Sequence, residues 1–234
     1  MRIDFHSHIL PGIDDGSASV EESIAMLQME ADHGVTHVVA TPHFYASDDK
    51  PMDFISRRDE AERALRNEMN KVGGLPQLLV GAEVSYFRGM SNSEFLPLLT
   101  IQNKKCIMIE MGPAPWTESV FEELSLIHRQ LGITPIIAHI DRYIAPFHTY
   151  HIPQRLAQLP VLVQANASFF LDRSTARMAV RMLRSDQIHL LGSDCHSLKY
   201  RKPNLGPAHQ IISQRLGLAG ENRLQAYGRM ALSL

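Results

Sequence analysis

The first sixteen residues of the chain place two histidines at the end of a short strand and a loop of carboxylates directly after it. Side chains alternate between the two faces of a strand, so His6 and His8 point the same way and can hold one cation between them. Asp14 and Asp15 follow within the loop. Because a His-x-His pair also arises by chance in ordinary proteins, this stretch alone predicts only half of a metal site.

The same pattern returns later in the sequence, where possible metal ligands follow short apolar runs. These residues are His43, Glu83, Glu110, His139, Asp194 and His196. Asp194 and His196 repeat the two-residue spacing of the first pair. Six further donors in equivalent places favour one shared site over coincidence.

Strand and helix patterns alternate seven times, which predicts a parallel sheet with helices outside it. After the opening strand, the expected strands cover residues 35–41, 78–83, 106–110, 134–139, 159–165 and 188–193. Six of the seven expected strands end in a candidate ligand, and parallel α/β folds build their sites at the carboxyl ends of strands. Only a closed or nearly closed barrel would bring all these ends to one mouth.

Length and charge narrow the class of protein further. The 234 residues fit one domain covering 1–234, and the formal net charge is −2 with no run of like charge. A nucleic-acid groove or an anionic membrane surface is therefore not expected. No apolar run reaches membrane-spanning length and no leader pattern opens the chain, so we expect a cytoplasmic protein that is not inserted in a membrane. Two cysteines are too few for a disulfide framework.

The predicted donors exceed what one cation takes. The set is His6, His8, Asp15, His43, Glu83, Glu110, His139, Asp194 and His196. A carboxylate can bridge two ions, so two or three divalent metals are expected, and a mixture of imidazole and carboxylate suits manganese, zinc or iron. Such a cluster generates a hydroxide nucleophile near neutral pH and clamps phosphoryl or acyl oxygens.

Several motifs resemble those of the polymerase-and-histidinol-phosphatase (PHP) superfamily, and within it the bacterial capsule-type protein tyrosine phosphatases. They are Met1 to Gly16, Thr41-Pro42-His43, the lone Glu83 and Glu110, Ile137 to Tyr143, and Gly192 to His196. The resemblance implies a distorted seven-stranded (β/α) barrel with a trinuclear cluster that usually depends on manganese. It also implies a phosphotyrosine protein as substrate, namely the tyrosine-rich tail of a partner kinase in exopolysaccharide synthesis.

The resemblance also assigns roles to single residues. It makes the nine donors the metal ligands, with Glu83 as the bridging carboxylate, and it matches Arg142 to an arginine that faces the phosphate. Arg201 matches a second phosphate contact more loosely. Without the resemblance, an arginine beside an acid is most often a surface ion pair worth under about 1 kcal/mol.

The sequence departs from the family pattern after His43, where Phe44, Tyr45 and Ala46 replace basic residues found in some members. Contacts to an anionic substrate are expected to be weaker there, or the preferred substrate different. Tyr45 and Trp116 are candidates to flank an aromatic phosphoester, although lone aromatic residues in loops are more often packed.

Two other functions compete with a tyrosine phosphatase. A phosphatase of the same superfamily that acts on histidinol phosphate or another small phosphoester uses the same cluster chemistry. A non-catalytic module stabilised by metal is the alternative of another class, but structural metal sites are normally closed and rich in thiolates.

Cys195 and Arg201 match the Cys-x5-Arg spacing of the unrelated cysteine-dependent tyrosine phosphatases. Such a phosphate loop favours glycine and small residues and leads into a helix, whereas this segment contains leucine, lysine and tyrosine. On a strand, Cys195 would also point away from its neighbours Asp194 and His196. We therefore predict that Cys195 is a packed residue behind the site and not the nucleophile.

Overall fold

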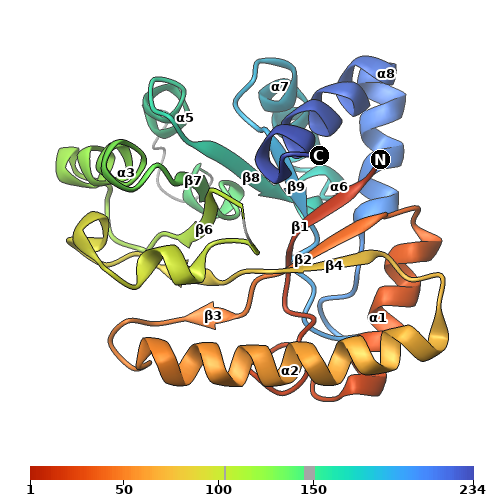
Figure 1. The fold of residues 1–234 in the computed structure, drawn as a ribbon. Coiled ribbons are helices and arrows are strands. Elements are labelled where there is room, and N and C mark those ends of the chain that lie inside the picture. The colour runs from red at the N-terminus through yellow and green to blue at the C-terminus, as the bar shows by residue number, and fades with distance from the viewer. Residues whose placement is uncertain (103, 145–150) are drawn as a thin grey trace.

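Strands and helices alternate along the computed structural model, which describes residues 1–102, 104–144 and 151–234 (Figure 1). The strands are β1 (Ile3–Ser7), β2 (His37–Ala40), β3 (His43–Phe44), β4 (Gln77–Val80), β5 (Glu83–Ser85), β6 (Cys106–Glu110), β7 (Thr134–Ile137), β8 (Leu162–Asn166) and β9 (Leu190–Gly192). The α-helices are α1 (Val20–Asp32), α2 (Pro51–Val72), α3 (Glu118–Leu131), α4 (Asp141–Ile144), α5 (His151–Leu156), α6 (Ala167–Leu171), α7 (Ala176–Arg184) and α8 (Leu205–Leu232). Each pairing between these strands is parallel, which confirms the expected α/β class.

The described strands form two sheets, in the orders β1-β2-β4 and β3-β5-β6-β7-β8-β9. The expected single sheet of seven strands is thereby corrected to a curled sheet of six beside a shorter sheet of three. The expected second strand ends within one residue of its predicted limit at 41, and a separate short strand, β3, follows it. Pro42 contributes to the break between the two because it has no N–H to donate. The expected third strand is interrupted at residues 81–82. The Glu83 N–H still donates to the Pro42 carbonyl across 2.9 Å, so the two chain segments remain hydrogen-bonded between the β2–β4 pair and the β3–β5 pair.

The two sheets also meet where β9 lies beside β1. A parallel bridge joins Ser7 to Cys195, and the His8 N–H donates to the Cys195 carbonyl across 2.9 Å. The Asp194 N–H donates to the His6 carbonyl across 2.8 Å. The first and last strands of the chain are therefore neighbours, and their carboxyl ends deliver four of the nine predicted donors together.

Local sequence signals set the ends of the first helix. The Glu22 N–H donates to the Ser19 hydroxyl across 3.2 Å, and the Glu22 carboxylate accepts from the Ala18 N–H. Ser19 and Glu22 thus form a capping box in all but the exact backbone donor, as the Ser-x-x-Glu spacing at residues 19–22 predicts. At the C-terminus of α1, Gly34 lies two residues beyond Asp32 and has φ of 74°. A residue with a left-handed backbone after the last turn commonly ends a helix.

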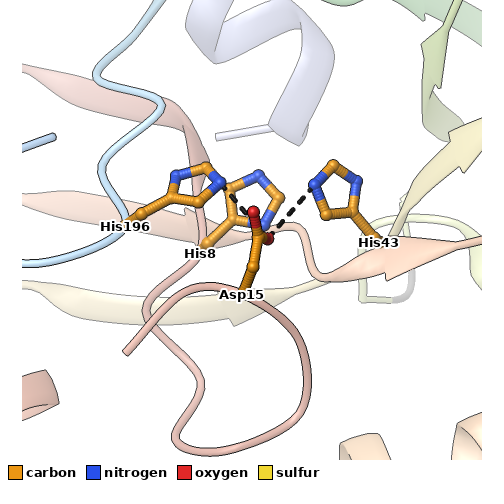
Figure 2. Close-up of side chains that lie close together, drawn as sticks. All are labelled: His8, Asp15, His43 and His196. Carbon is orange, nitrogen blue, oxygen red and sulfur yellow. Dashed lines mark ion pairs between the residues drawn. The ribbon is translucent and has the colours of Figure 1, made fainter. Parts of the chain in front are cut away.

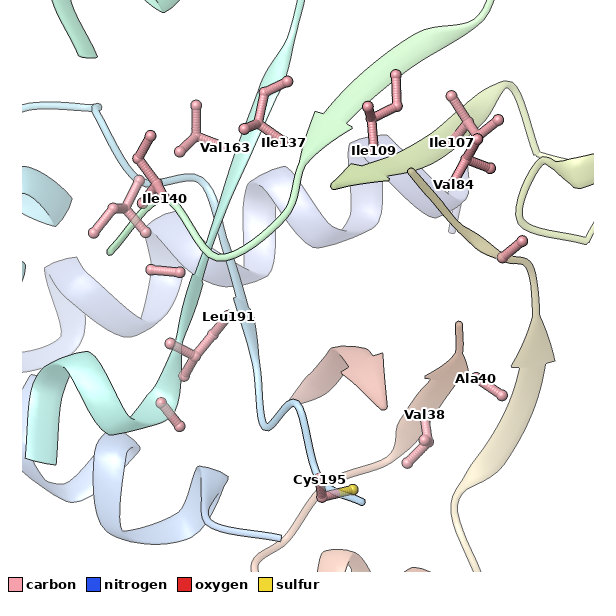
Figure 3. Packing of buried hydrophobic residues seen from close by; sticks show 14 of the residues in the cluster. Val38, Ala40, Val84, Ile107, Ile109, Ile137, Ile140, Val163, Leu191 and Cys195 are labelled. Carbon is pink, nitrogen blue, oxygen red and sulfur yellow. The ribbon is translucent and has the colours of Figure 1, made fainter. Parts of the chain in front are cut away.

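The core consists of two apolar clusters that lie on the two faces of the strands. Along β6, Ile107 and Ile109 belong to the larger cluster, whereas Cys106 and Met108 belong to the smaller one. This alternation follows from the two-residue period of a strand. Figure 3 shows strand residues of the larger cluster, which also contains side chains from α1, α2, α3, α7 and α8. With apolar side chains on both faces, the sheet leaves its strand ends as the place for polar groups.

The two helices expected near 207–217 and 220–230 are both present within the span of α8, where Gly217, with φ of 60° and ψ of −153°, separates two helical parts by a kink. Residues 92–99 were expected to form at most a short helix, and they contain the end of one 3₁₀ turn, η1 (Met90–Asn92), and a second, η2 (Leu96–Leu99). Within the described residues, none of the helices has the length and hydropathy needed to cross a membrane.

Candidate metal centre

All nine predicted donors lie at one mouth of the curled sheet. Each comes from the end of a strand, the start of a short strand or the loop after it, and the set is His6 (β1), His8 and Asp15 (after β1), His43 (β3), Glu83 (β5), Glu110 (β6), His139 (after β7), and Asp194 and His196 (after β9). Most are buried, but the Asp15 side chain is 68% exposed. Segments far apart in the sequence thus converge where parallel folds build their sites.

Glu83 is the centre of this cluster. One carboxylate oxygen, Oε2, lies 3.2 Å from His6 Nε2, 3.3 Å from His8 Nε2 and 3.1 Å from His43 Nδ1. The other oxygen, Oε1, lies 2.9 Å from His139 Nε2. Four imidazoles therefore face a single carboxylate that is 1% exposed.

The surroundings of Glu83 favour its charged form. Burial alone would raise the pKa of the Glu83 carboxyl. The charge of His6 and hydrogen bonds from the imidazoles, those of His139 and His43 among them, outweigh burial and hold the pKa well below its usual range. A buried carboxylate with this many partners is ready to accept cations on both of its oxygens.

Three overlapping sets of donor atoms each lie within 4.8 Å of one another. They are His8, Asp15, His43 and His196; His6, His8 and Asp194; and His43, Glu83 and Glu110. Figure 2 shows the first set, in which Asp15 Oδ1 lies 3.5 Å from both His43 Nε2 and His196 Nε2. Because the sets share His8 and His43, they form one continuous centre with room for more than one ion. The donors are imidazoles and carboxylates without a thiolate, which fits divalent transition metals.

Protonation of the imidazoles depends on their neighbours. Burial alone would lower the pKa of His8, but hydrogen bonds to Asp14 and Glu83 raise it to about 10. His139 behaves in the same way, and Glu110 and Glu83 raise its pKa to about 9. Burial, with the charges of His8 and Arg201, lowers the pKa of His196 to about 4. Carboxylates therefore outweigh burial near Glu83, whereas burial and the neighbouring cations together lower the pKa of His196.

Several residues that orient the donors were not predicted from the sequence. Asp14 Oδ2 lies 2.8 Å from His8 Nδ1, and its other oxygen accepts the Gly16 N–H, so the predicted loop cap also orients a histidine. Gln164 Oε1 accepts the His139 N–H across 2.6 Å and lies 3.3 Å from His6 Nδ1. Asn166 Nδ2 donates to Asp194 Oδ2 across 2.9 Å. The Asp14-Asp15 pair was a sequence signal for the first of these, whereas Gln164 and Asn166 lie within strand β8 without any motif.

Two of the donors have a left-handed backbone. His139 has φ of 29° and Asp194 has φ of 53°. Both lie two residues beyond the last residue of a parallel strand, where the chain leaves the sheet. The left-handed conformation directs their side chains into the mouth, and it is uncommon for residues other than glycine.

Arg142 and Arg201 lie together on one side of the cluster. Arg142 Nη2 donates to Asp194 Oδ2 across 2.7 Å, and Nη1 lies 3.3 Å from Glu110 Oε1. Arg201 pairs with the same Asp194 oxygen, and its Nη1 lies 2.9 Å from His196 Nε2. The two arginine side chains are 42% and 40% exposed, so they lie at the rim and are accessible to an incoming anion.

The aromatic candidates differ in their distance from the cluster. The Tyr45 ring stacks on His43 with centroids 5.4 Å apart and is 38% exposed. Trp116 packs against Tyr143, with centroids 5.3 Å apart, and the Tyr143 hydroxyl lies 3.1 Å from His139 Nδ1. Phe44 is fully buried, which excludes it from the surface. Of the two aromatic residues in the segment Phe44 to Ala46, Tyr45 is therefore the one that borders the donors and is exposed.

Cys195 lies behind the cluster. Its side chain is fully buried, and burial together with the charges of Asp4 and Glu30 raises the pKa of the thiol well above its usual value. A reactive cysteine needs an exposed and electropositive environment. Cys195 is instead buried beside two carboxyl groups, which agrees with the prediction that it is a packed residue.

The comparisons with known proteins agree on one group. A family model described as capsular polysaccharide synthesis, CpsB/CapC, matches residues 2–231. Tyrosine-protein phosphatase CpsB of Streptococcus agalactiae is 29% identical over 232 residues, which cover 95% of this chain and 94% of that protein. Tyrosine-protein phosphatase YwqE of Bacillus subtilis is 26% identical over 225 residues, covering 92% and 85% of the two chains.

A solved structure has the same fold. It belongs to a study of YwqE from Bacillus subtilis and CpsB from Streptococcus pneumoniae, described there as unique metal-dependent tyrosine phosphatases. It superposes with a TM-score of 0.79 at 22% identity and covers 95% of this chain and 94% of its own. The curled parallel sheet is thus shared over nearly the whole length of both chains.

Proposed function

The chain belongs to the CpsB/CapC family of capsular polysaccharide synthesis proteins, and from this membership and the site we infer that it is a metal-dependent protein-tyrosine phosphatase. The enzyme hydrolyses a phosphoric monoester, so water attacks phosphorus and the tyrosyl oxygen leaves. The names of the relatives support the activity, and the polar mouth of the sheet provides a place for it.

The observation that carries this conclusion is the arrangement around Glu83. Four imidazoles contact one buried carboxylate, and two arginines lie on the open side of the same cluster. Divalent cations bound there would activate water and neutralise phosphoryl oxygens. The protein's own contribution is to hold the donors in place through Asp14, Gln164 and Asn166 and to leave one side open.

We propose that the nine donors bind two to three divalent ions and that Glu83 bridges two of them. Support comes from its two oxygens, which face different imidazoles. Manganese is the proposed native metal because the resemblance to the capsule-type phosphatases implies it, and a set of imidazoles and carboxylates without thiolates is compatible with it. Zinc and iron accept similar ligands, so metal analysis of gently purified protein decides between them.

Arg142 is proposed to bind the phosphoryl oxygens, with Arg201 as a second contact. Both guanidinium groups lie beside Asp194 at the rim, and the planar arginine fork matches the geometry of phosphate. The proposed substrate is the phosphorylated tyrosine-rich tail of a bacterial tyrosine kinase in capsule or exopolysaccharide synthesis. Capsule synthesis is part of the family description, whereas the kinase comes from the sequence resemblance.

Turnover of a phosphotyrosyl peptide against histidinol phosphate tests the proposed substrate class. We expect the peptide to be hydrolysed with the higher kcat/KM, and we expect a chelator to abolish activity and added Mn²⁺ to restore it. A preference for histidinol phosphate would instead assign a small phosphoester as substrate. Metal-loaded protein that hydrolyses neither compound would support the non-catalytic alternative.

Cys195→Ser separates this chemistry from that of the cysteine-dependent phosphatases. The buried thiol lies behind the cluster, so the variant should keep most of its activity and its sensitivity to chelation. Both the metal-dependent and the cysteine-dependent mechanism assign Arg201 to the phosphate, so a substitution of Arg201 would not discriminate between them. An inactive variant with its full metal content, together with wild-type activity that resists chelation, would contradict the proposed mechanism.

A further inference from the structure

A pocket of about 540 Å³ opens beside the metal centre. Its wall includes Asp194 and Arg142, so it is continuous with the place proposed for the phosphoryl group. It is also lined by the segment from Lys199 to Lys202 and by Asn204. Pockets for small ligands range from about 300 to 1,000 Å³, so this space has room for more than the phosphoryl group.

The charges in this pocket are not balanced. Four basic residues, Arg142, Lys199, Arg201 and Lys202, face two acidic ones, Asp141 and Asp194. Both arginines pair with Asp194. The side chains of the two lysines form no ion pair within residues 1–102, 104–144 and 151–234. The uncompensated positive charge of the pocket therefore lies on Lys199 and Lys202.

The start of helix α8 adds to this charge. Asn204 lines the pocket and directly precedes the first part of α8, which begins at Leu205 and runs to the kink at Gly217. The N-terminus of a helix carries a partial positive charge and attracts anions. The two lysines and this helix end thus act on the same space from neighbouring segments.

We propose that this pocket binds a second anionic group of the substrate, carried by a residue close to the phosphotyrosine. The proposal rests on the proposed function, because it places the phosphotyrosine phosphate at Arg142 and Arg201. Lys199 and Lys202 would then bind the flanking group, which is a carboxylate or a second phosphate. Lysine suits this role because its ammonium is a point charge on a flexible stem and tolerates different positions of the anion. The segment Phe44 to Ala46 lacks basic residues, so anion recognition shifts to this side of the mouth.

Matched phosphotyrosyl peptides test the proposal. One series has neutral residues beside the phosphotyrosine, a second has glutamates and a third has a second phosphotyrosine. The wild-type enzyme should hydrolyse both anionic series with about 3- to 10-fold higher kcat/KM than the neutral series, since two exposed charge contacts contribute this much. This preference should weaken with added salt.

Lys199→Gln combined with Lys202→Gln should abolish this preference mainly through KM and leave kcat/KM for the neutral peptide unchanged. The matched control is Lys50→Gln with Lys71→Gln, which removes the same charge from the two ends of helix α2, away from this pocket. Fluorescence anisotropy of peptides with a non-hydrolysable phosphonate in place of the phosphate gives the same comparison without turnover.

The outcomes separate this proposal from the proposed function. Hydrolysis of all peptides without preference, or a preference that survives loss of both lysines, would reject the second-anion pocket and leave the phosphatase assignment intact. Failure to hydrolyse any phosphotyrosyl peptide would reject the assignment itself. A gain only with the doubly phosphorylated series would identify phosphate as the second group, and an equal gain with glutamate would identify any nearby anion.

Discussion

Glu83 and Glu30 are both buried, yet their neighbours give them opposite chemistry. Glu83, at the mouth of the sheet, is 1% exposed and faces four imidazoles. Glu30, on helix α1, is 0% exposed and lies with Asp4 and Cys195 in a group whose possible ligand atoms are within 4.8 Å of one another. Among the residues that the structure describes, none donates a hydrogen bond to either carboxylate oxygen of Glu30.

The pKa shifts of these two glutamates go in opposite directions. Burial opposes ionisation of both, but the cationic surroundings of Glu83 outweigh it and hold the pKa well below the usual range. Burial raises the pKa of Glu30 well above that range, and the neighbouring Asp4 raises it further. Burial alone therefore does not mark a metal ligand. The discriminating feature is the set of donors that surrounds the carboxylate.

The largest expected effect comes from removing the carboxylate of the cluster. Glu83→Ala should lose bound metal and at least about 1,000-fold in kcat, because the loss of a bridge exceeds the loss of a single transition-state contact. Metal content and turnover check this together. Glu30→Gln is the matched control, since it alters an equally buried glutamate and should retain both. Similar losses in the two variants would mean that burial, and not ligation, is what matters.

An intermediate effect is expected at the rim of the cluster. Arg142→Ala should lower turnover by about 100- to 1,000-fold at unchanged metal content, because the arginine acts on charge that develops in the transition state. Arg129→Ala, on the exposed face of α3, is the control for loss of a positive charge. Full activity of Arg142→Ala would return this residue to an ordinary surface ion pair with Asp194.

The smallest effect is expected at Glu30 and concerns stability. A carboxyl whose pKa is raised in the folded state binds a proton more tightly there than in the unfolded chain. Its contribution is therefore fully present below about pH 4.5 and is lost as pH rises toward the folded-state pKa. Glu30→Gln removes this dependence and supplies a donor toward Asp4, which should stabilise the protein by about 0.5–1.5 kcal/mol near neutral pH.

Urea denaturation of wild type and Glu30→Gln at pH 5 and pH 8 measures this difference. The variant should gain more, relative to wild type, at pH 8 than at pH 5. An equal difference at both values would show that Glu30 does not change its protonation on folding in this range, and the contrast with Glu83 would then lose its electrostatic basis.

The sequence predicted the convergence of donors because each of them follows a strand of recognisable pattern. Strand periodicity and the rule for parallel sheets are sufficient to bring His6, Glu83 and Asp194 to one mouth. The break at residues 81–82 was not predicted, because the apolar pattern continues through Gly81 and Ala82. Periodicity reports which residues are buried and not where the hydrogen bonding of a strand is interrupted.

Hydrogen bonds between residues that are distant in the sequence could not be predicted either. Asp4 accepts hydrogen bonds from the Ser193 N–H and hydroxyl, and from the His6 N–H two residues along its own strand. Gln164 reaches both His6 and His139. Such contacts depend on which strands become neighbours, and no local motif encodes this. Asp14 was recognised as a loop residue, but its contact with His8 required the folded loop.

The left-handed backbone at His139 and Asp194 restricts which amino acids can replace these two proposed ligands in evolution. Histidine, aspartate and asparagine are several-fold enriched among the non-glycine residues that adopt this conformation. Glutamate binds metals equally well, but in place of Asp194 it would meet an unfavourable backbone and carry its carboxylate one methylene too far. Exchange of ligand types among homologues should therefore be rare at these two positions and more frequent at Glu110, where the backbone is extended within a strand.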